Sequence, residues 1–269
     1  TRGLGDVYKR QPRLYLCVNI LVTYLFMSVD AFACSTAAWL GGSSGAVSVN
    51  DPANGVPSVS GSCGFKVSGE GYVQDNSPVA EDEFIGRFYF FPQFSGTGAT
   101  DIFVAYSNEA STELFSVTYN GSQITIDATL AGGGTASVAI NGTKWHLIEF
   151  SWVSGDTGGL WIDADATLDP ASATFDSGSG SIEAVRLGAP NGLDGLFGEA
   201  FFDDYVSHRF SPIGGILAGD GDLNGIIDLG DIDAIKSEFL YGTYAIGSTD
   251  CNFDGGTNSG DINCVVEKL

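Results

Sequence analysis

The chain has 269 residues, of which 33 are acidic and 11 are basic, and its formal net charge is −22. Such a negative charge repels nucleic acids and anionic membranes, so the sequence predicts neither as a partner. The length allows more than one domain.

Residues 1–33 are expected to be a foreign start followed by a signal peptide. The segment Asp6–Gln11 resembles the translated mosaic end of transposon-based sequencing libraries, and the alternative is an ordinary basic start. Leu14–Phe26 is almost wholly apolar and is followed by the small-x-small cleavage signal Ala31–Ala33. The run is too short to span a membrane, so we expect secretion. A lipid anchor on Cys34 is disfavoured because Ala31 stands where such signals carry Leu.

The cysteines agree with secretion. Loss of Cys17 with the signal peptide leaves Cys34, Cys63, Cys251 and Cys264, an even number typical of disulfides in an oxidising compartment. Three pairings are open, and the economical one joins Cys34 to Cys63 and Cys251 to Cys264. Metal binding by these cysteines is not expected, because no C-x-x-C spacing occurs.

Residues 34–209 are predicted to form one mainly β domain, an antiparallel sandwich. From Phe65 to Arg209 apolar residues recur with period two, and Asn120-Gly121 is a strong hairpin signal. Many short strands separated by turn signals favour a sandwich. The segments expected as strands are 84–91, closing at Pro92, then 101–106, 114–119, 123–127, 136–140, 145–152, 160–163, 182–187 and 199–206.

Three segments of this domain resemble the laminin-G-like, concanavalin-A-type jelly roll. They are Lys144–Glu149, Leu160–Asp163 and Phe201–Asp204. The resemblance implies the fold and says little about the ligand. The turn after Asp163 departs from the family, because Ala164-Asp165 stands where glycine is common. Domains of this kind can hold calcium at the rim, and the oxygens available for such a third ion are on Asp163, Asp165, Asp203 and Asp204.

Whether the sandwich is an enzyme is left open, with the residues favouring no catalysis. Laminarinase-type glycosidases share this fold and use two glutamates close together on one strand. No segment provides that spacing; Glu81–Glu83 precedes a strand, and His146 is expected to be structural. For sugar binding, Trp39 and Tyr72 are the aromatic residues least committed to the core.

A twelve-residue calcium loop is predicted at Asp220–Asp231. Calcium prefers six to eight oxygen ligands, and an EF-hand-like loop supplies them at positions 1, 3, 5, 7, 9 and 12, with glycine at position 6. Gly225 stands at position 6, and Ile227 at position 8 is expected to anchor the loop to a small core. The predicted ligands are Asp220, Asp222, Asn224, the carbonyl of Ile226, Asp228 and Asp231.

The pattern recurs at Asp250–Asp261, with Gly255 at position 6 and Thr257 at the position of Ile227. A single match could be a solvated turn, but two matches followed by helical patterns favour two calcium ions. The predicted ligands of the second loop are Asp250, Asn252, Asp254, the carbonyl of Gly256, Asn258 and Asp261.

Two loops that end in aspartate, each followed by one helix, resemble a dockerin. The resemblance covers residues 218–269 and implies a cohesin-like or other protein partner. The positions that determine partner choice in dockerins, Leu229-Gly230 and Ser259-Gly260, differ between the two loops. The second helix stops at Leu269, so truncation of the module is left open. The first helix is expected from Leu229 to about Tyr241.

The helical stripe of Ile232, Ile235 and Phe239 is predicted to pack on Val265 and Val266 of the second helix. The outer face would then present Leu229, Lys236 and Tyr241 to a partner, unless Leu229 and Tyr241 cover the module's own core.

Residues 210–217, with Pro212 and two glycines, are expected to be a linker between the modules. The sequence as a whole therefore predicts a secreted bacterial calcium-binding protein. Its sandwich would bind a polysaccharide or cell-surface ligand without catalysis, and its tail would attach to a protein. The alternatives are a polysaccharide-degrading enzyme, or a fragment of one, and a purely structural surface protein.

Overall fold

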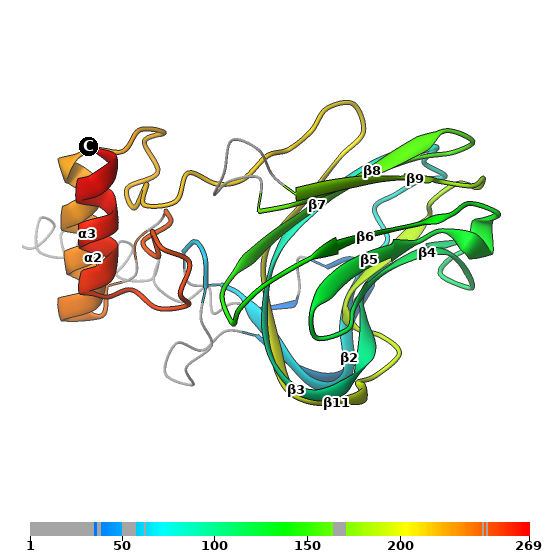
Figure 1. The fold of residues 1–269 in the computed structure, drawn as a ribbon, viewed down its shortest axis with the longest axis horizontal. Coiled ribbons are helices and arrows are strands. Elements are labelled where there is room, and N and C mark those ends of the chain that lie inside the picture. Colours follow the sequence, from blue (N-terminus) through cyan, green and yellow to red (C-terminus); the bar gives the residue numbers. More distant parts are fainter. Residues whose placement is uncertain are drawn as a thin grey trace, which may run out of the picture.

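The computed structural model describes residues 35–36, 39–49, 58–61, 63–163, 171–243, 245 and 247–269. The expected foreign start and signal peptide, together with Cys34 and Asp165, lie outside these residues. The fold-class prediction is confirmed: the described chain is mainly β, with an antiparallel sheet and two C-terminal helices (Figure 1).

Three long strands run through both layers of the sandwich: β2 (Phe65–Asp75), β3 (Glu83–Ser107) and β11 (Asp194–His208). The first half of β3 pairs with β7 and β11, and its second half pairs with β4 and β10. One layer therefore contains β7, β8 and β9, and the other contains β10, β4, β5 and β6.

The shorter strands follow the expected segments, with two additions, β1 and β9. They are β1 (Gly42–Val49), β4 (Thr112–Tyr119), β5 (Gln123–Asp127), β6 (Thr135–Ala139), β7 (His146–Val153), β8 (Thr157–Ile162), β9 (Ala171–Asp176) and β10 (Ala184–Ala189), with a short 3₁₀ turn at Thr129–Ala131.

The main core lies between the two layers and is built from aromatic side chains. Phe88, Phe103 and Phe150 are fully buried, and the rings of Phe103 and Phe150 lie 4.8 Å apart between centroids. Alternate residues of a strand point to opposite faces, so the period-two pattern places these residues inside. The hairpin predicted at Asn120-Gly121 joins β4 to β5 and is confirmed.

The expected end of a strand at Pro92 is wrong, because β3 continues through this residue. Pairing between β3 and β7 ends at Phe90, whereas Pro92 pairs with Ala200 of β11. Beyond Phe90 the strand has no β7 neighbour that would need a backbone N–H, so proline is tolerated there.

The C-terminal module contains α2 (Leu229–Tyr241) and α3 (Ser259–Lys268), which lie side by side at one end of the molecule (Figure 1). The bounds expected for the first helix are confirmed. Ile232, Ile235 and Val265 form the core with Cys251, and Ile227 packs against it as expected.

The packing expected for Phe239 and Val266 is wrong, since both side chains are about half exposed. The core does not reach them, because its buried members are only Ile232, Ile235, Cys251 and Val265. The side chains of Leu229, Lys236 and Tyr241 are exposed, so Leu229 and Tyr241 do not cover the module's core.

The second loop of the module packs against the outer face of the β7 layer. Phe253 is only 7% exposed and joins Tyr89, Phe91 and Trp145 in a second apolar cluster. The N–H of Trp145 donates to the carbonyl of Phe253 at 3.0 Å. A Cβ atom on Gly255 would lie 2.7 Å from the ring of Phe91, so the loop backbone and the sandwich are in close contact.

Residues 210–217, expected to be a linker, are held on the same face. The N–H groups of Ile213 and Gly214 donate to the two oxygens of Glu149 at 3.0 and 2.8 Å. The N–H of Ile216 donates to the hydroxyl of Tyr89 at 3.0 Å. Backbone groups bound in this way fix the path of the chain between the modules.

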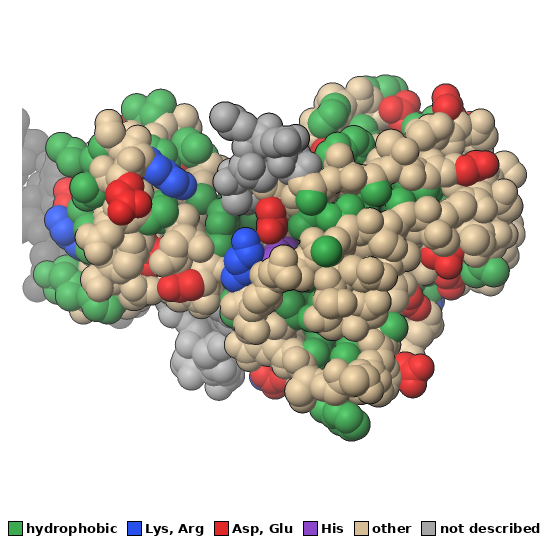
Figure 2. All heavy atoms as spheres, in the orientation of Figure 1, with side chains coloured by type: hydrophobic (Ala, Val, Ile, Leu, Met, Phe, Trp, Pro, Cys, Tyr) green, Lys and Arg blue, Asp and Glu red, His purple; other side chains and the backbone are tan. Residues whose placement is uncertain are grey.

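Figure 2 shows acidic side chains scattered over the sandwich face turned to the viewer, not gathered into one patch. No helix among the described residues has the length and apolar character needed to cross a membrane.

The contact made by Phe253 predicts an asymmetry between the two loops. Phe253→Ala should lower the free energy of unfolding by about 3 kcal/mol, because it leaves a cavity in a buried cluster. Leu223 occupies the same position in the first loop and is 62% exposed. Leu223→Ala is therefore the matched control and should change stability by less than about 0.5 kcal/mol. Urea denaturation in the presence of calcium measures both, and equal effects would contradict the docking of the second loop.

Candidate metal centre

Each acidic loop runs directly into the helix that follows it. Asp228 caps α2 by accepting from the N–H of Gly230, and Asp231 accepts in return from the N–H of Asp228. Asn258 and Asp261 make the same reciprocal capping box at α3. Capping satisfies N–H groups that have no partner inside the helix. The last two side chains of each loop pattern therefore also start a helix.

In the first loop the backbone turns inward around the carboxylate of Asp220. The N–H groups of Asn224 and Gly225 donate to its two oxygens, both at 2.9 Å. The N–H of Gly221 donates to Asp231 at 2.8 Å. Asp220, Asp222 and Asp231 each place an oxygen within 4.8 Å of the others, and Asp220 and Asp231 are buried. This acidic triad can bind a metal ion.

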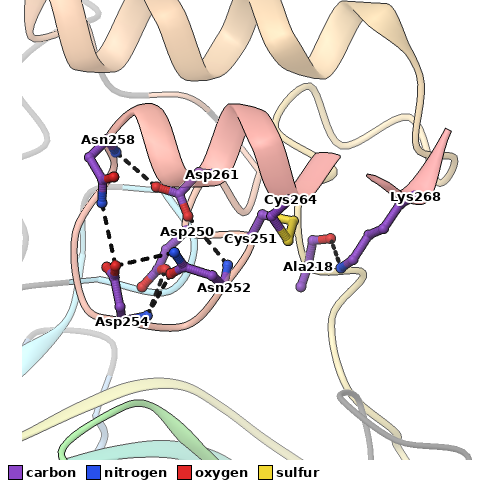
Figure 3. The surroundings of a disulfide bond; sticks show 9 residues. All are labelled: Ala218, Asp250, Cys251, Asn252, Asp254, Asn258, Asp261, Cys264 and Lys268. Atoms are coloured by element: carbon purple, nitrogen blue, oxygen red, sulfur yellow. Dashed lines mark hydrogen bonds between the residues drawn. A yellow bond between two sulfur atoms is a disulfide. The ribbon is translucent and has the colours of Figure 1, made fainter. Parts of the chain in front are cut away.

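The second loop makes the equivalent backbone hydrogen bonds (Figure 3). The N–H groups of Asp254 and Gly255 donate to the two oxygens of Asp250 at 3.0 and 2.8 Å. The N–H of Asn252 donates to Asp261 at 3.3 Å. In Figure 3 the side chains of Asp250, Asn252, Asp254 and Asp261 point to the inside of the loop.

Backbone conformation confirms that the loops are equivalent. Leu223 and Phe253, both at position 4, have φ of 58° and 57°, in the left-handed region. Gly225 and Gly255, at position 6, have φ of 85° and 94°, which is why glycine is required there. Two segments of different composition thus adopt one conformation, which the spacing of their oxygen-bearing residues predicted.

Electrostatics favour a cation in the second loop. Burial and the nearby charges of Asp261 and Asp254 raise the pKa of Asp250 to about 7, although backbone N–H groups oppose the shift. Burial also raises the pKa of Asp261. Like charges held together in this way are stabilised by a proton or by a positive ion. A hard divalent cation with oxygen ligands fits the donor set.

The remaining predicted ligands lie in or next to the loops. The amide oxygen of Asn224 accepts from the N–H of Ile226, and its nitrogen donates to Asp222. The amide nitrogen of Asn258 donates to the carbonyl of Gly256 at 2.8 Å. The predicted ligand set stays a prediction, with four carboxylates in the first loop and three in the second.

The predicted disulfide between Cys251 and Cys264 is present and joins position 2 of the second loop to α3 (Figure 3). The ammonium of Lys268, at the end of α3, donates to the carbonyl of Ala218 at 2.8 Å. Cys63 is also disulfide-bonded, and Cys34, its expected partner, lies outside the described residues.

The carboxylates expected at the sandwich rim have separate partners. Asp163 contacts His146 and Lys144, at 3.1 and 3.2 Å, and Asp204 contacts Arg87 at 3.1 Å. Asp203 is buried and accepts from the N–H groups of Val59, Ser60 and Asp204. Burial raises the pKa of Asp203 to about 7. Among the described residues, the carboxylates of Asp163, Asp203 and Asp204 therefore do not form a calcium site at the rim of the sandwich.

Two contact residues of the module were missed by the sequence analysis. Phe253 is an aromatic residue at a loop position that is expected to face water. An aromatic residue at such a position is the signal that could have indicated a contact with another part of the chain. Glu149 was noted only as the end of a segment that resembles the jelly roll, and nothing in the sequence shows that it binds the backbone of residues 213–214. Of the freer aromatic residues, Trp39 stacks on Tyr205 at 5.0 Å between ring centroids.

No family model and no curated protein matches the sequence. Among solved structures, the chain is similar to the cellulose-induced protein Cip1, with a TM-score of 0.45, 12% identity, and coverage of 67% of this chain and 92% of that one. It is also similar to the receptor-binding domain of botulinum neurotoxin type G, with a TM-score of 0.40, 12% identity, and coverage of 65% of this chain. The chain spans 44% of the length of that domain. At these values the similarity concerns the fold alone.

The Asp163 cluster predicts a pH dependence of stability. Burial disfavours its charged form, but the hydrogen bond and charge of His146 and the charge of Lys144 lower the pKa of the Asp163 carboxyl below its usual value. Its contribution to stability is therefore present above the unfolded pKa and is lost as pH falls through the folded pKa. Asp163→Asn should destabilise the protein near neutral pH and should flatten the acid part of the curve.

Asparagine tolerates the left-handed backbone of position 163, where φ is 54°, so the change tests the charge. Asp233→Asn, at a side chain that is 83% exposed, is the control and should leave the curve unchanged. Urea denaturation at several pH values measures the free energy of unfolding of each protein and tests this prediction. Parallel curves for wild type and Asp163→Asn would show that the ion pairs contribute nothing.

Proposed function

We propose that the chain is a secreted bacterial protein with two functions in one unit. Its sandwich binds a polysaccharide or cell-surface ligand without catalysis, and its dockerin-like C-terminal module binds two calcium ions and attaches to a protein partner. The observation that supports the proposal most is the repetition of one acidic loop conformation at Asp220–Asp231 and Asp250–Asp261. The cohesin-like class of partner rests on the dockerin resemblance.

Calcium would serve here as a structural ion. Each loop has one following helix and no leading helix, so there is no helix pair that could open and expose a groove. The ions would hold the loops and the helix starts in one shape. Because ligands must come from a folded loop, binding free energy adds to the folding free energy of the module.

The surface around the first loop fits the attachment role. Leu223, Ile226 and Leu229 are all exposed there, although each is a large apolar side chain. The equivalent side of the second loop is turned toward the sandwich, where Phe253 is buried. Exposed apolar groups of this kind favour a protein contact. We therefore expect the protein partner to bind the exposed residues of the first loop and the outer face of α2.

A polysaccharide-acting enzyme is the second candidate, because of three carboxylates on neighbouring strands. Burial, and then the charges of Asp101 and Asp127, raise the pKa of Glu113 on β4. A carboxyl group with a raised pKa beside other acids is typical of a general acid. Release of reducing ends from a polysaccharide, abolished in Glu113→Gln, would favour this alternative over simple binding.

The attachment role is tested by pull-down with the secreted fraction of the source organism and with recombinant cohesin domains. Wild-type protein should capture a partner in calcium. Asp220→Ala/Asp250→Ala should lose it by unfolding the module, and Leu229→Glu/Lys236→Glu should lose it while staying folded. Leu130→Glu, at an exposed apolar residue of the sandwich, is the matched control and should bind like wild type. Capture by the calcium-site variant equal to wild type would contradict the role.

A further inference from the structure

One arginine of the sandwich lacks the partner that all its counterparts have. Lys66, Arg87, Lys144 and Arg209 each lie within 3.2 Å of a carboxylate. None of the ion pairs found among the described residues includes Arg186. In a chain with 33 acidic residues, a cation without a carboxylate partner is unexpected.

The guanidinium of Arg186 is nevertheless held in place. It lies over the ring of Tyr72 at 4.4 Å and over the ring of Tyr106 at 4.7 Å. Its Nε donates to the side-chain oxygen of Gln74 at 2.7 Å, and its Nη1 is 3.4 Å from the hydroxyl of Tyr106. Aromatic rings and an amide thus fix the plane of the group, and no negative charge is used to do so.

These four side chains come from three neighbouring strands, β2, β10 and β3, and form what we call the Arg186 centre. Arg186 pairs with Gln74 on one side and with Val104 on the other. Its chain neighbours Val185 and Leu187 belong to the core between the layers, so Arg186 points to the opposite, outer face. The centre therefore faces away from the core, with Arg186, Tyr72 and Gln74 partly exposed and Tyr106 buried beneath the guanidinium.

Two hollows lie at the two ends of β10, with the Arg186 centre between them. One, of about 590 Å³, is lined by Asp101, Thr118 and Asn191, and the other, of about 580 Å³, by Asn76, Glu109 and Glu183. A six-residue strand is roughly 20 Å long. The two polar hollows and the strand between them define an open, elongated surface, which fits a chain of polar units better than a small molecule.

We infer that the Arg186 centre binds a carboxylate of an acidic polysaccharide, a chain containing uronic acid units. This inference rests on the proposed sugar-binding role of the sandwich and specifies the ligand class. A planar guanidinium fixed in orientation is suited to bidentate binding of a carboxylate. In the hollow beside Thr118, Asp101, which accepts from Thr118 and Asn191, would accept hydroxyl groups of the next sugar unit.

The acidic neighbours restrict how the chain can lie. Asp101 and Glu113 are both close enough to Tyr106 to raise its pKa, after burial as the main cause. They would repel a second carboxylate placed on the Thr118 side of the centre. We therefore expect one uronate carboxylate at Arg186 and hydroxyl contacts towards Asp101.

Calorimetry with hexagalacturonic acid, its fully methyl-esterified form and cellohexaose tests the inference on the whole protein in calcium. Wild type should bind the uronate chain and should bind the ester at least about tenfold more weakly, since esterification removes the charge-assisted hydrogen bonds. Arg186→Gln should weaken uronate binding by about tenfold or more. Arg186→Lys should also weaken it, because a lysine keeps the charge but loses the planar fork.

Lys66→Gln removes one positive charge from the same domain at a residue paired with Glu199, and it should bind like wild type. Circular dichroism and thermal unfolding check that the Arg186 variants are folded. Unchanged uronate binding by folded Arg186→Gln overturns the inference. Binding of cellohexaose or the ester as tightly as the uronate overturns it too, but leaves the sugar-binding role intact.

Binding of none of the three chains overturns the inference and counts against a sugar-binding sandwich, while the pull-down separately decides the attachment role. A peptide with a free C-terminal carboxylate that binds more tightly than hexagalacturonate would assign the centre to a protein ligand and contradict the inference.

Discussion

The C-terminal module is stable only if the repulsion between its carboxylates is offset. Its own hydrogen bonds hold these carboxylates close together. In each loop, backbone N–H groups donate to the first aspartate, Asp220 or Asp250. The last aspartate, Asp231 or Asp261, accepts from the N–H of the residue that caps the following helix. These hydrogen bonds stabilise part of the negative charge, but they also fix the carboxylates of each loop close to one another. Burial is the main cause that raises the pKa of Asp250 to about 7, and repulsion from Asp261 and Asp254 adds to this shift. A divalent cation would remove this repulsion, and the module has little apolar core with which to offset it otherwise.

The same loops also determine how the module sits on the sandwich. Phe253 is at position 4 of the second loop, and its carbonyl accepts from the N–H of Trp145, just before β7. The conformation that would hold an ion is therefore the conformation that presents Phe253 to Tyr89 and Phe91. Glu149 and Tyr89 fix residues 213–216 on the same face. If a cation orders the second loop, it also orders the junction between the modules, and the first loop remains accessible to a partner.

Local sequence patterns predicted the sandwich and both acidic loops. They did not predict the contacts between segments that are far apart in the sequence. Oxygen-bearing residues at fixed spacing identified both loops, and the alternation of apolar residues identified the sandwich and most of its strands, since both signals are local. The continuation of β3 through Pro92 could not be predicted, because it depends on where β7 stops pairing. The docking of Phe253 and the aromatic contacts of Arg186 depend on side chains at least 80 residues away in sequence, so neither has a local pattern. The packing assigned to Phe239 was wrong because periodicity gives the face of a helix but not the extent of the core beneath it.

The central claim is that the two loops bind calcium and that the ions order the module. The most direct measurement is calcium titration of the metal-free protein by calorimetry, with far-ultraviolet circular dichroism recorded before and after the addition of chelator. The account predicts two binding events, of which Asp220→Ala and Asp250→Ala each remove one, and a loss of helical signal on chelation that calcium restores. No heat of binding together with a helical signal that chelator leaves unchanged would contradict it.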